Sequence, residues 1–179
     1  MEIKNKPVMQ LHLTQKESRS ELFETVGNFL ASHKLKVASK DFERPWGGFY
    51  VIDEPQAQQF AKLFFPDLEF SDLQISGKLS PKILMVAPNK RLSWQYHHRR
   101  AEIWKLIGGT AGVVTSTTDE QGPLKVLKDQ EVIQLAQGQR HRLVGVDGWG
   151  VIAEIWRHTD ARNPSNESDI VRLQDDFGR

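Results

Sequence analysis

The most constraining feature of this sequence is a series of short apolar runs, separated by turn-forming residues, that begins near residue 70. Pairs such as Pro88-Asn89, Gly108-Gly109 and Asp147-Gly148 stand between the runs. Regularly spaced short runs with such turn signals are typical of a β-sandwich or β-barrel. We therefore predict a mainly β fold, whose expected strands are Ile83–Ala87, Leu92–His97, Glu102–Ile107, Ala111–Thr115, Leu124–Leu127, Glu131–Leu135, His141–Val146 and Val151–Trp156.

The residues before this region have helical rather than strand spacing. Residues 15–33 carry apolar side chains three and four positions apart, which predicts one amphipathic helix. Thr14 is the expected N-cap, and Glu17 would complete a capping box. A second short helix is expected from Pro55 to Phe65. Both helices are expected to pack on the outside of the sheet, with a partner-binding arm as the alternative for the first.

The chain has 179 residues, which corresponds to about one domain and is enough to bury a core. We divide it into an N-terminal helical extension, residues 1–41, and a barrel domain, residues 42–179, which form one compact unit. No stretch resembles a signal peptide or reaches the roughly 18 apolar residues of a membrane span. We therefore expect a soluble protein of the cytoplasm with no membrane partner.

The composition excludes several kinds of chemistry. The chain has no cysteine, which excludes disulfides, thiolate metal sites and cysteine nucleophiles. It has 24 Lys and Arg residues against 23 Asp and Glu residues, a net charge of +1. So balanced a charge argues against a nucleic-acid partner bound by bulk electrostatics. It remains compatible with a local basic pocket for a phosphorylated small molecule.

A dense group of polar residues stands in the middle of the β region. Because side chains alternate between the two faces of a strand, Gln95 and His97 point the same way and His98 points the other way. A turn at residues 98–101 would bring Glu102 onto the neighbouring strand, and His141 starts another strand. Two imidazoles, a carboxylate and an amide oxygen make an open divalent-metal site. The alternative is that they are hydrogen-bonded core groups of a barrel without a metal.

The spacing of these residues resembles the cupin signature. Its first motif runs from a Gly to a ligand, any residue, a His, three or four residues, a Glu, six residues and a Gly. Gln95, His97, Glu102 and Gly109 fit this spacing, with Gln95 where many cupins have His. Asn89 stands where the leading Gly would be. This resemblance implies a cupin barrel, a double-stranded β-helix or jelly roll, with the N-terminal helices packed outside.

The second cupin motif, Pro-x-Gly-x-x-His, also has a counterpart. Gly138 and His141 are present, and Ala136 replaces the Pro. The two motifs lie about 40 residues apart and both fall on predicted strands.

The match narrows to one branch of the cupins. The stretch from Leu92 to Trp104 resembles the type II phosphomannose isomerase domain, which is often fused to a mannose-1-phosphate guanylyltransferase. Arg44–Gly47 resembles the segment that opens this domain, and Asp169–Arg179 resembles the segment that closes it. The ligand types, and the segment Pro81–Leu84, also resemble the type I isomerases.

The resemblance implies a metal-dependent aldose–ketose isomerase that converts mannose 6-phosphate to fructose 6-phosphate through an enediol. The expected cofactor is one divalent ion, with zinc first and manganese, iron or nickel as alternatives. The metal would polarise the carbonyl group and stabilise the enediolate. Lys82, His98 and Arg142 are the candidate catalytic residues, and Lys82, Arg100 and Arg142 are the candidates for binding the substrate phosphate.

Other functions remain open. One is an isomerase of another sugar phosphate, such as a heptose phosphate. A second is a non-catalytic cupin that binds a sugar or sugar phosphate, which the lost leading Gly and the lost Pro of the second motif favour. A third is a metal oxygenase, although the site lacks a third His. A homodimer through outer strands is also expected, because Trp94 and Tyr96 would lie on the outer face.

Overall fold

Two long antiparallel strands organise the fold, which we describe from a computed structural model for residues 11–179. β5 (Arg100–Ser116) and β8 (Arg140–His158) pair with each other along nearly their whole length. On the outer edge of β5, its first half pairs with β7 (Val132–Leu135) and its second half with β6 (Leu124–Val126). The predicted mainly β fold is confirmed.

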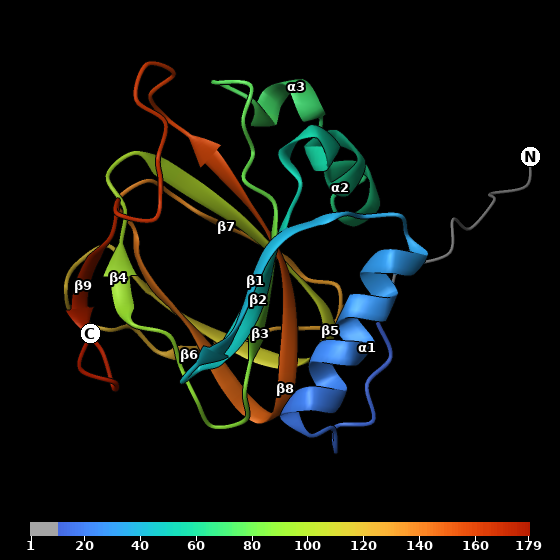
Figure 1. Ribbon diagram of the computed structural model, residues 1–179. Coiled ribbons are helices and arrows are strands. Elements are labelled where there is room, and N and C mark those ends of the chain that lie inside the picture. Colours follow the sequence, from blue (N-terminus) through green and yellow to red (C-terminus); the bar gives the residue numbers. More distant parts are fainter. Residues whose placement is uncertain (1–10) are drawn as a thin grey trace, which may run out of the picture.

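The other edge of β8 carries the remaining strands (Figure 1). Its second half pairs with β3 (Lys82–Val86), from which the sheet continues to β2 (Gly47–Ile52) and β1 (Val37–Arg44). Its first half pairs with β4 (Trp94–Tyr96), which pairs in turn with β9 (Val171–Gln174). β4 and β9 therefore lie on the side of the barrel opposite the helices (Figure 1).

Each long strand contains an irregular stretch near its middle. The register of β5 with β8 shifts between Leu106 and Gly108, and again between Gly109 and Ala111. Gly109 has a φ of +68°, and a Cβ there would lie 1.9 Å from the carbonyl oxygen of Trp149, so the position requires glycine. As a result, the β5 residues facing the barrel interior have even numbers up to Leu106 and odd numbers from Ala111.

The turns expected at Gly108-Gly109 and Asp147-Gly148 are therefore wrong. Both pairs lie inside continuous strands, so the four strands expected around them are two, β5 and β8. The glycines permit irregular pairing between two strands that continue on either side, whereas a turn would have reversed the chain.

Helix α1 (Arg19–Ser32) starts later than expected. Its N-cap is Ser18, and the side chain and backbone of Ser18 form a complete capping box with Glu21. Thr14 heads a similar hydrogen-bonded turn, but the next residue, Gln15, has a φ of +68°, which lies outside the α-helical region. The expected N-cap at Thr14 is therefore wrong, because the helix begins about one helical turn later, after Ser18.

The second expected helix is confirmed. A 3-10 turn, η1 (Glu54–Gln56), places Pro55 at the start and leads into α2 (Ala57–Phe64). A further single turn, α3 (Phe70–Leu73), follows and was not predicted. The helices lie together on one side of the barrel (Figure 1).

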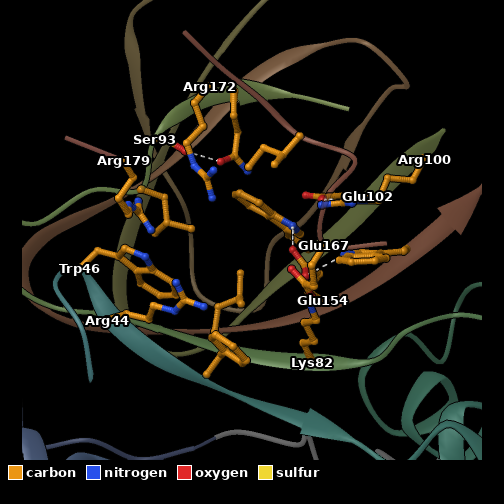
Figure 2. Close-up of a pocket in the computed structure, with 17 residues that line it drawn as sticks. Arg44, Trp46, Lys82, Ser93, Arg100, Glu102, Glu154, Glu167, Arg172 and Arg179 are labelled. Atoms are coloured by element: carbon orange, nitrogen blue, oxygen red, sulfur yellow. Dashed lines mark hydrogen bonds and ion pairs between the residues drawn. The ribbon is translucent and has the colours of Figure 1, made fainter. Parts of the chain in front are cut away.

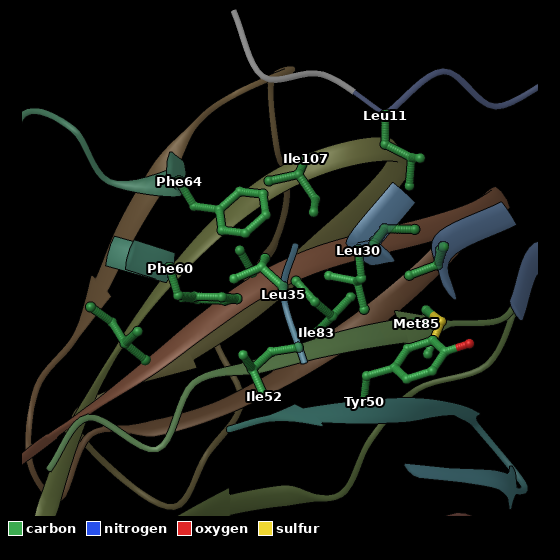
Figure 3. Packing of buried hydrophobic residues seen from close by; sticks show 14 of the residues in the cluster. Leu11, Leu30, Leu35, Tyr50, Ile52, Phe60, Phe64, Ile83, Met85 and Ile107 are labelled. Carbon is green, nitrogen blue, oxygen red and sulfur yellow. The ribbon is translucent and has the colours of Figure 1, made fainter. Parts of the chain in front are cut away.

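The sheet separates two hydrophobic cores. In β3, Ile83 and Met85 point toward the helices, and Leu84 and Val86 point into the barrel. Burial on both faces explains why β3 is apolar at nearly every position. Figure 3 shows the helix-side core, which includes Leu11, Leu30, Leu35, Tyr50, Ile52, Phe60, Phe64 and Ile107. The barrel core includes Trp46, Trp104, Leu106, Val113, Leu135, Leu143 and Ile152.

Strand β1 crosses the boundary expected between residues 1–41 and residues 42–179. That division stays a prediction, and its first ten residues lie outside the part of the chain that the structure describes. Within residues 11–179, no helix has the length and apolar character needed to cross a membrane.

Candidate metal centre

Three of the predicted metal ligands meet inside one end of the barrel. His97 follows β4, Glu102 lies near the start of β5, and His141 lies near the start of β8. The Nε2 of His97 is 3.1 Å from Oε1 of Glu102, and the Nε2 of His141 is 3.3 Å from Oε2. Each of the three residues is 2% exposed, and their ligand atoms lie within 4.8 Å of one another.

The hydrogen bonds made by the Nδ1 atoms of the two imidazoles turn both Nε2 atoms toward the Glu102 carboxylate. The Nδ1 of His97 lies 2.7 Å from the carbonyl oxygen of Asp169, and the Nδ1 of His141 lies 2.9 Å from that of Gln139. A carbonyl oxygen only accepts, so both Nδ1 atoms carry the proton in this assignment. Both Nε2 lone pairs then face the Glu102 carboxylate, which also only accepts when ionised. The Nε2 of His97 also lies 3.2 Å from Nη2 of Arg100, which can donate to it, so His141 is the imidazole left without a donor.

Two buried acceptors that face each other need a cation or a proton between them. The Nε2 of His141 and the Oε2 of Glu102 have no hydrogen-bond partner among the described residues, and both atoms are buried. Unpartnered buried polar atoms are costly, and imidazole nitrogens with a carboxylate oxygen are common ligands of divalent transition metals. The residues present therefore fit a divalent metal ion.

Gln95 lies beside this group. It pairs with His141 across β4 and β8, so the two side chains share a face of the sheet. Its amide oxygen accepts a hydrogen bond from the Ser93 hydroxyl. The role of Gln95 as a fourth ligand stays a prediction.

Arg100 completes the buried charges of the site. Its Nε donates to Oε1 of Glu102 at 2.8 Å, and its guanidinium carbon lies 3.6 Å from the centre of the Trp156 ring. Burial alone would raise the pKa of Glu102, but His97 and the Arg100 guanidinium hold that pKa well below its usual range. Glu102 is therefore a carboxylate, the form that binds a metal. Arg100, expected to contact phosphate, is engaged inside the metal centre.

The loop after β8 holds His97 and the residues that follow it in place through hydrogen bonds to Asp169. The Asp169 carboxylate accepts hydrogen bonds from the backbone N–H groups of His98 and Arg99, both at 3.0 Å, and from the Ser165 hydroxyl at 2.6 Å. Although burial opposes ionisation, these hydrogen bonds and the Arg99 charge lower the pKa of Asp169 to about 2. The same residue supplies the carbonyl that orients His97.

A pocket opens from the metal centre, with a cavity volume of about 110 Å³. The barrel-facing residues Lys82, Glu102, Trp104, Glu154 and Trp156 form one side of it. Figure 2 shows these charged groups on one side and the side chains of three arginines on the other; the arginines are Arg44, Arg172 and Arg179. The pocket is therefore lined by charged groups of both signs.

Glu154 is a second buried carboxyl group in this pocket, and it was not predicted. It is 4% exposed and accepts hydrogen bonds from the indole N–H of Trp104 at 2.8 Å and of Trp156 at 2.9 Å. Burial, with the neighbouring charge of Glu102, raises the pKa of Glu154 to about 7, against the opposing influence of Lys82. The sequence signal that could have identified it is the position of an acidic residue inside the apolar run Val151–Trp156.

The structure brings some predicted residues to the pocket and places others elsewhere. Lys82 and Arg100 line it. His98 is exposed in the bend that follows β4, and Arg142 points away from His141, donating to the carbonyl oxygen of Leu92. Neither lines this pocket, and their expected roles stay predictions. Arg142 points away because of strand alternation, since it follows His141 directly.

His158 ties the end of β8 to the supporting loop. Its Nδ1 accepts from the Ser165 N–H at 2.9 Å, and its Nε2 lies 3.2 Å from the Ser80 hydroxyl oxygen. Burial, together with the positive charges of Lys78 and Arg100, lowers the pKa of His158 to about 4. The folded protein therefore keeps this imidazole neutral.

We expect His158 to make the metal-free protein less stable as the pH falls from about 6.5 to about 4. The unfolded imidazole takes up a proton near pH 6.5, whereas the folded one resists protonation down to about pH 4. The loss is up to about 3 kcal/mol at 1.36 kcal/mol per pKa unit. Urea unfolding in a chelator at several pH values measures it. A His158→Gln protein should show a weaker dependence, and an identical dependence would contradict the assignment.

A β-barrel that holds two histidines and a glutamate at these strand positions is a cupin-type domain. The predicted cupin fold is thus confirmed. The chain belongs to the family described as mannose-6-phosphate isomerase C-terminal, whose model matches residues 53–175.

Two curated relatives agree with this assignment. The chain is 31% identical over 156 residues to the alginate biosynthesis protein AlgA of Pseudomonas aeruginosa, a match that covers 87% of this chain and 30% of the relative. It is 30% identical over 147 residues to a mannose-1-phosphate guanylyltransferase of Escherichia coli, covering 82% and 24%. A Cupin 2 conserved barrel domain protein of Salinispora arenicola has a TM-score of 0.40 and 24% identity, covering 50% of this chain and 69% of that chain.

These names correct the expected activity. The curated relatives are named as mannose-1-phosphate guanylyltransferases or as proteins of alginate and xanthan biosynthesis, and not as isomerases. The chain spans less than a third of the length of these relatives. These names overturn the expected conversion of mannose 6-phosphate to fructose 6-phosphate. That activity had been inferred from the motif alone.

Proposed function

We propose that this chain is a divalent-metal-dependent binding domain for a small phosphorylated sugar. The observation that supports it best is the combination of the metal-ready group with a basic pocket. Five cations line the pocket against three carboxylates; the cations are Arg44, Lys82, Arg100, Arg172 and Arg179, and the carboxylates are Glu102, Glu154 and Glu167. Excess positive charge suits an anionic ligand, and guanidinium groups match phosphate oxygens.

Zinc is the metal we propose, held by His97, Glu102 and His141 with Gln95 as a further ligand. Two imidazoles and one carboxylate are ligands that zinc shares with other transition metals, and zinc sites that bind small molecules keep a position open. The ion would supply a Lewis-acidic centre for a ligand hydroxyl or carbonyl oxygen. The protein residues would orient the rest of the ligand.

The size of the pocket and the relatives' names guide the choice of sugar. A cavity of about 110 Å³ is smaller than the roughly 300 Å³ at the lower end of ordinary ligand sites, which favours a small ligand over a nucleotide. Relatives named for mannose 1-phosphate make mannose phosphates the first compounds to test. A cytoplasmic location and a homodimer remain parts of the proposal.

Calorimetric titration tests the proposal directly. We expect zinc-loaded protein to bind mannose 1-phosphate or mannose 6-phosphate at least tenfold more tightly than mannose. Treatment with a chelator should weaken this binding at least tenfold. A His98→Ala protein is the matched control, because His98 is an exposed imidazole next to the site and should leave affinity unchanged. The proposal fails if neither phosphate ester binds, or if chelation leaves the affinity as it was.

A further inference from the structure

Some of the cationic side chains that line the pocket are already paired with carboxylates of the pocket, and others are not. Lys82 is ion-paired with Glu167, and its ammonium group lies 4.2 Å from the centre of the Trp156 ring. Arg100 is held by Glu102 and by the Ser165 hydroxyl. Both are therefore engaged at the metal end of the pocket. The remaining cations are the three arginines Arg44, Arg172 and Arg179.

The sheet register explains how these arginines reach one place. Arg172 on β9 pairs with Gln95 on β4, and Gln95 lines the pocket, so both side chains lie on the inner face. Arg44 ends β1 opposite Gly47, which has no side chain to block the guanidinium. Arg179 approaches from the C-terminal segment. Figure 2 shows the three arginine side chains converging on the side of the pocket opposite Glu102 and Glu154.

The carboxylates near these arginines lie outside the pocket lining. Asp41 is 2.9 Å from the Nε of Arg44, and Asp175 is 2.8 Å from the Nε of Arg179. Neither aspartate lines the pocket. The guanidinium group of Arg172 has no ion pair or hydrogen bond to any residue within 11–179, although its backbone pairs with β4. The cluster therefore has guanidinium nitrogens available and no carboxylate of its own on the pocket side.

We propose that Arg44, Arg172 and Arg179 form a phosphate subsite, distinct from the metal end of the pocket. This inference rests on the proposed function and extends it. The phosphate monoester of the ligand binds at the arginine end, and its sugar hydroxyls extend toward Glu102 and the metal. Three guanidinium groups can share the oxygens of one phosphate dianion through charge-assisted hydrogen bonds. A neutral sugar gains nothing from them, so this subsite selects phosphorylated ligands.

The test compares Arg172→Gln, Arg44→Gln and the double variant with wild-type protein. Arg157→Gln is the matched control, because Arg157 is exposed, lies outside this pocket and changes the net charge equally. We expect each single variant to weaken binding of mannose 6-phosphate or mannose 1-phosphate by about tenfold or more, the usual range for a hydrogen bond to a charged group. Affinity for mannose and the zinc content should stay unchanged, and Arg157→Gln should bind normally.

The outcomes separate this inference from the proposed function. If the double variant binds the sugar phosphates as tightly as wild type, and chelation still weakens that binding, the phosphate lies elsewhere and only the subsite is overturned. If wild type binds no sugar phosphate, the proposed function fails. Inorganic phosphate then tests the subsite alone: phosphorus NMR line broadening by wild type that the double variant lacks supports it, and no broadening by wild type overturns it.

Discussion

Exchange of Glu102 for Gln should destabilise the metal-free protein by about 3–5 kcal/mol, the usual cost of removing one partner of a buried ion pair. The carboxylate is 2% exposed and accepts from Arg100, which is itself 5% exposed. A neutral amide leaves the Arg100 guanidinium without its counter-charge in a buried setting. The same substitution removes the central ligand of the proposed zinc site, so stoichiometric zinc binding should be lost.

Two measurements check this result. Urea unfolding in a chelator gives the stability of the metal-free protein, and metal analysis after dialysis gives the zinc content. His98→Ala serves as the control and should keep both values, because its exposed imidazole lies outside the site. A Glu102→Gln protein with wild-type stability would show that the buried ion pair between Arg100 and Glu102 does not stabilise the metal-free fold. Retained zinc would show that the ion binds elsewhere.

Glu154 should make the metal-free protein less stable as the pH rises from about 4.5 to about 7. Its pKa is raised in the folded state, so the unfolded carboxyl group ionises near pH 4.5 while the folded one keeps its proton until about pH 7. The stabilising contribution is therefore complete below pH 4.5 and is lost by about pH 7. At 1.36 kcal/mol per pKa unit, the change is up to about 3 kcal/mol.

A Glu154→Gln protein isolates this contribution. Glutamine is neutral at every pH, so wild type should lose about 2–3 kcal/mol relative to the variant between pH 4.5 and pH 7. The comparison between the two proteins is needed because His158 makes the protein more stable as the pH rises over an overlapping range. This contribution of His158 is the same in wild type and in the variant, so it cancels in the difference between their free energies of unfolding. Urea unfolding at both pH values, with chelator present, provides the data. A constant difference would mean that Glu154 titrates normally.

The metal group could be predicted because its information is local in the sequence. Alternation along a strand puts Gln95 and His97 on one face, and the motif spacing adds Glu102 and His141. The remaining features depend on pairing between distant segments. The reversal of faces near Gly109 follows from an irregular register between β5 and β8, which short-range patterns do not encode. For the same reason, β5 and β8 were each predicted as two strands.

Other features could not be predicted for similar physical reasons. Arg142 was expected to contact the ligand because it adjoins His141, but it does not line this pocket, since strand alternation sends the two side chains to opposite faces. Asp169 orients His97 from 72 residues away through a backbone carbonyl, which has no residue-type signature at all. The raised pKa of Glu154 depends on its burial beside Glu102, which appears only after the strands pair.

The two ends of the pocket are built on different kinds of scaffold. The metal group lies at the ends of strands β4, β5 and β8, whose register fixes it. The arginine end uses the end of β1, the edge strand β9 and the segment after it. Edge and terminal segments tolerate replacement better than paired central strands. Descendants of such a barrel can therefore change the anion they accept while inheriting the same metal chemistry, so ligand preference would diverge faster than the fold.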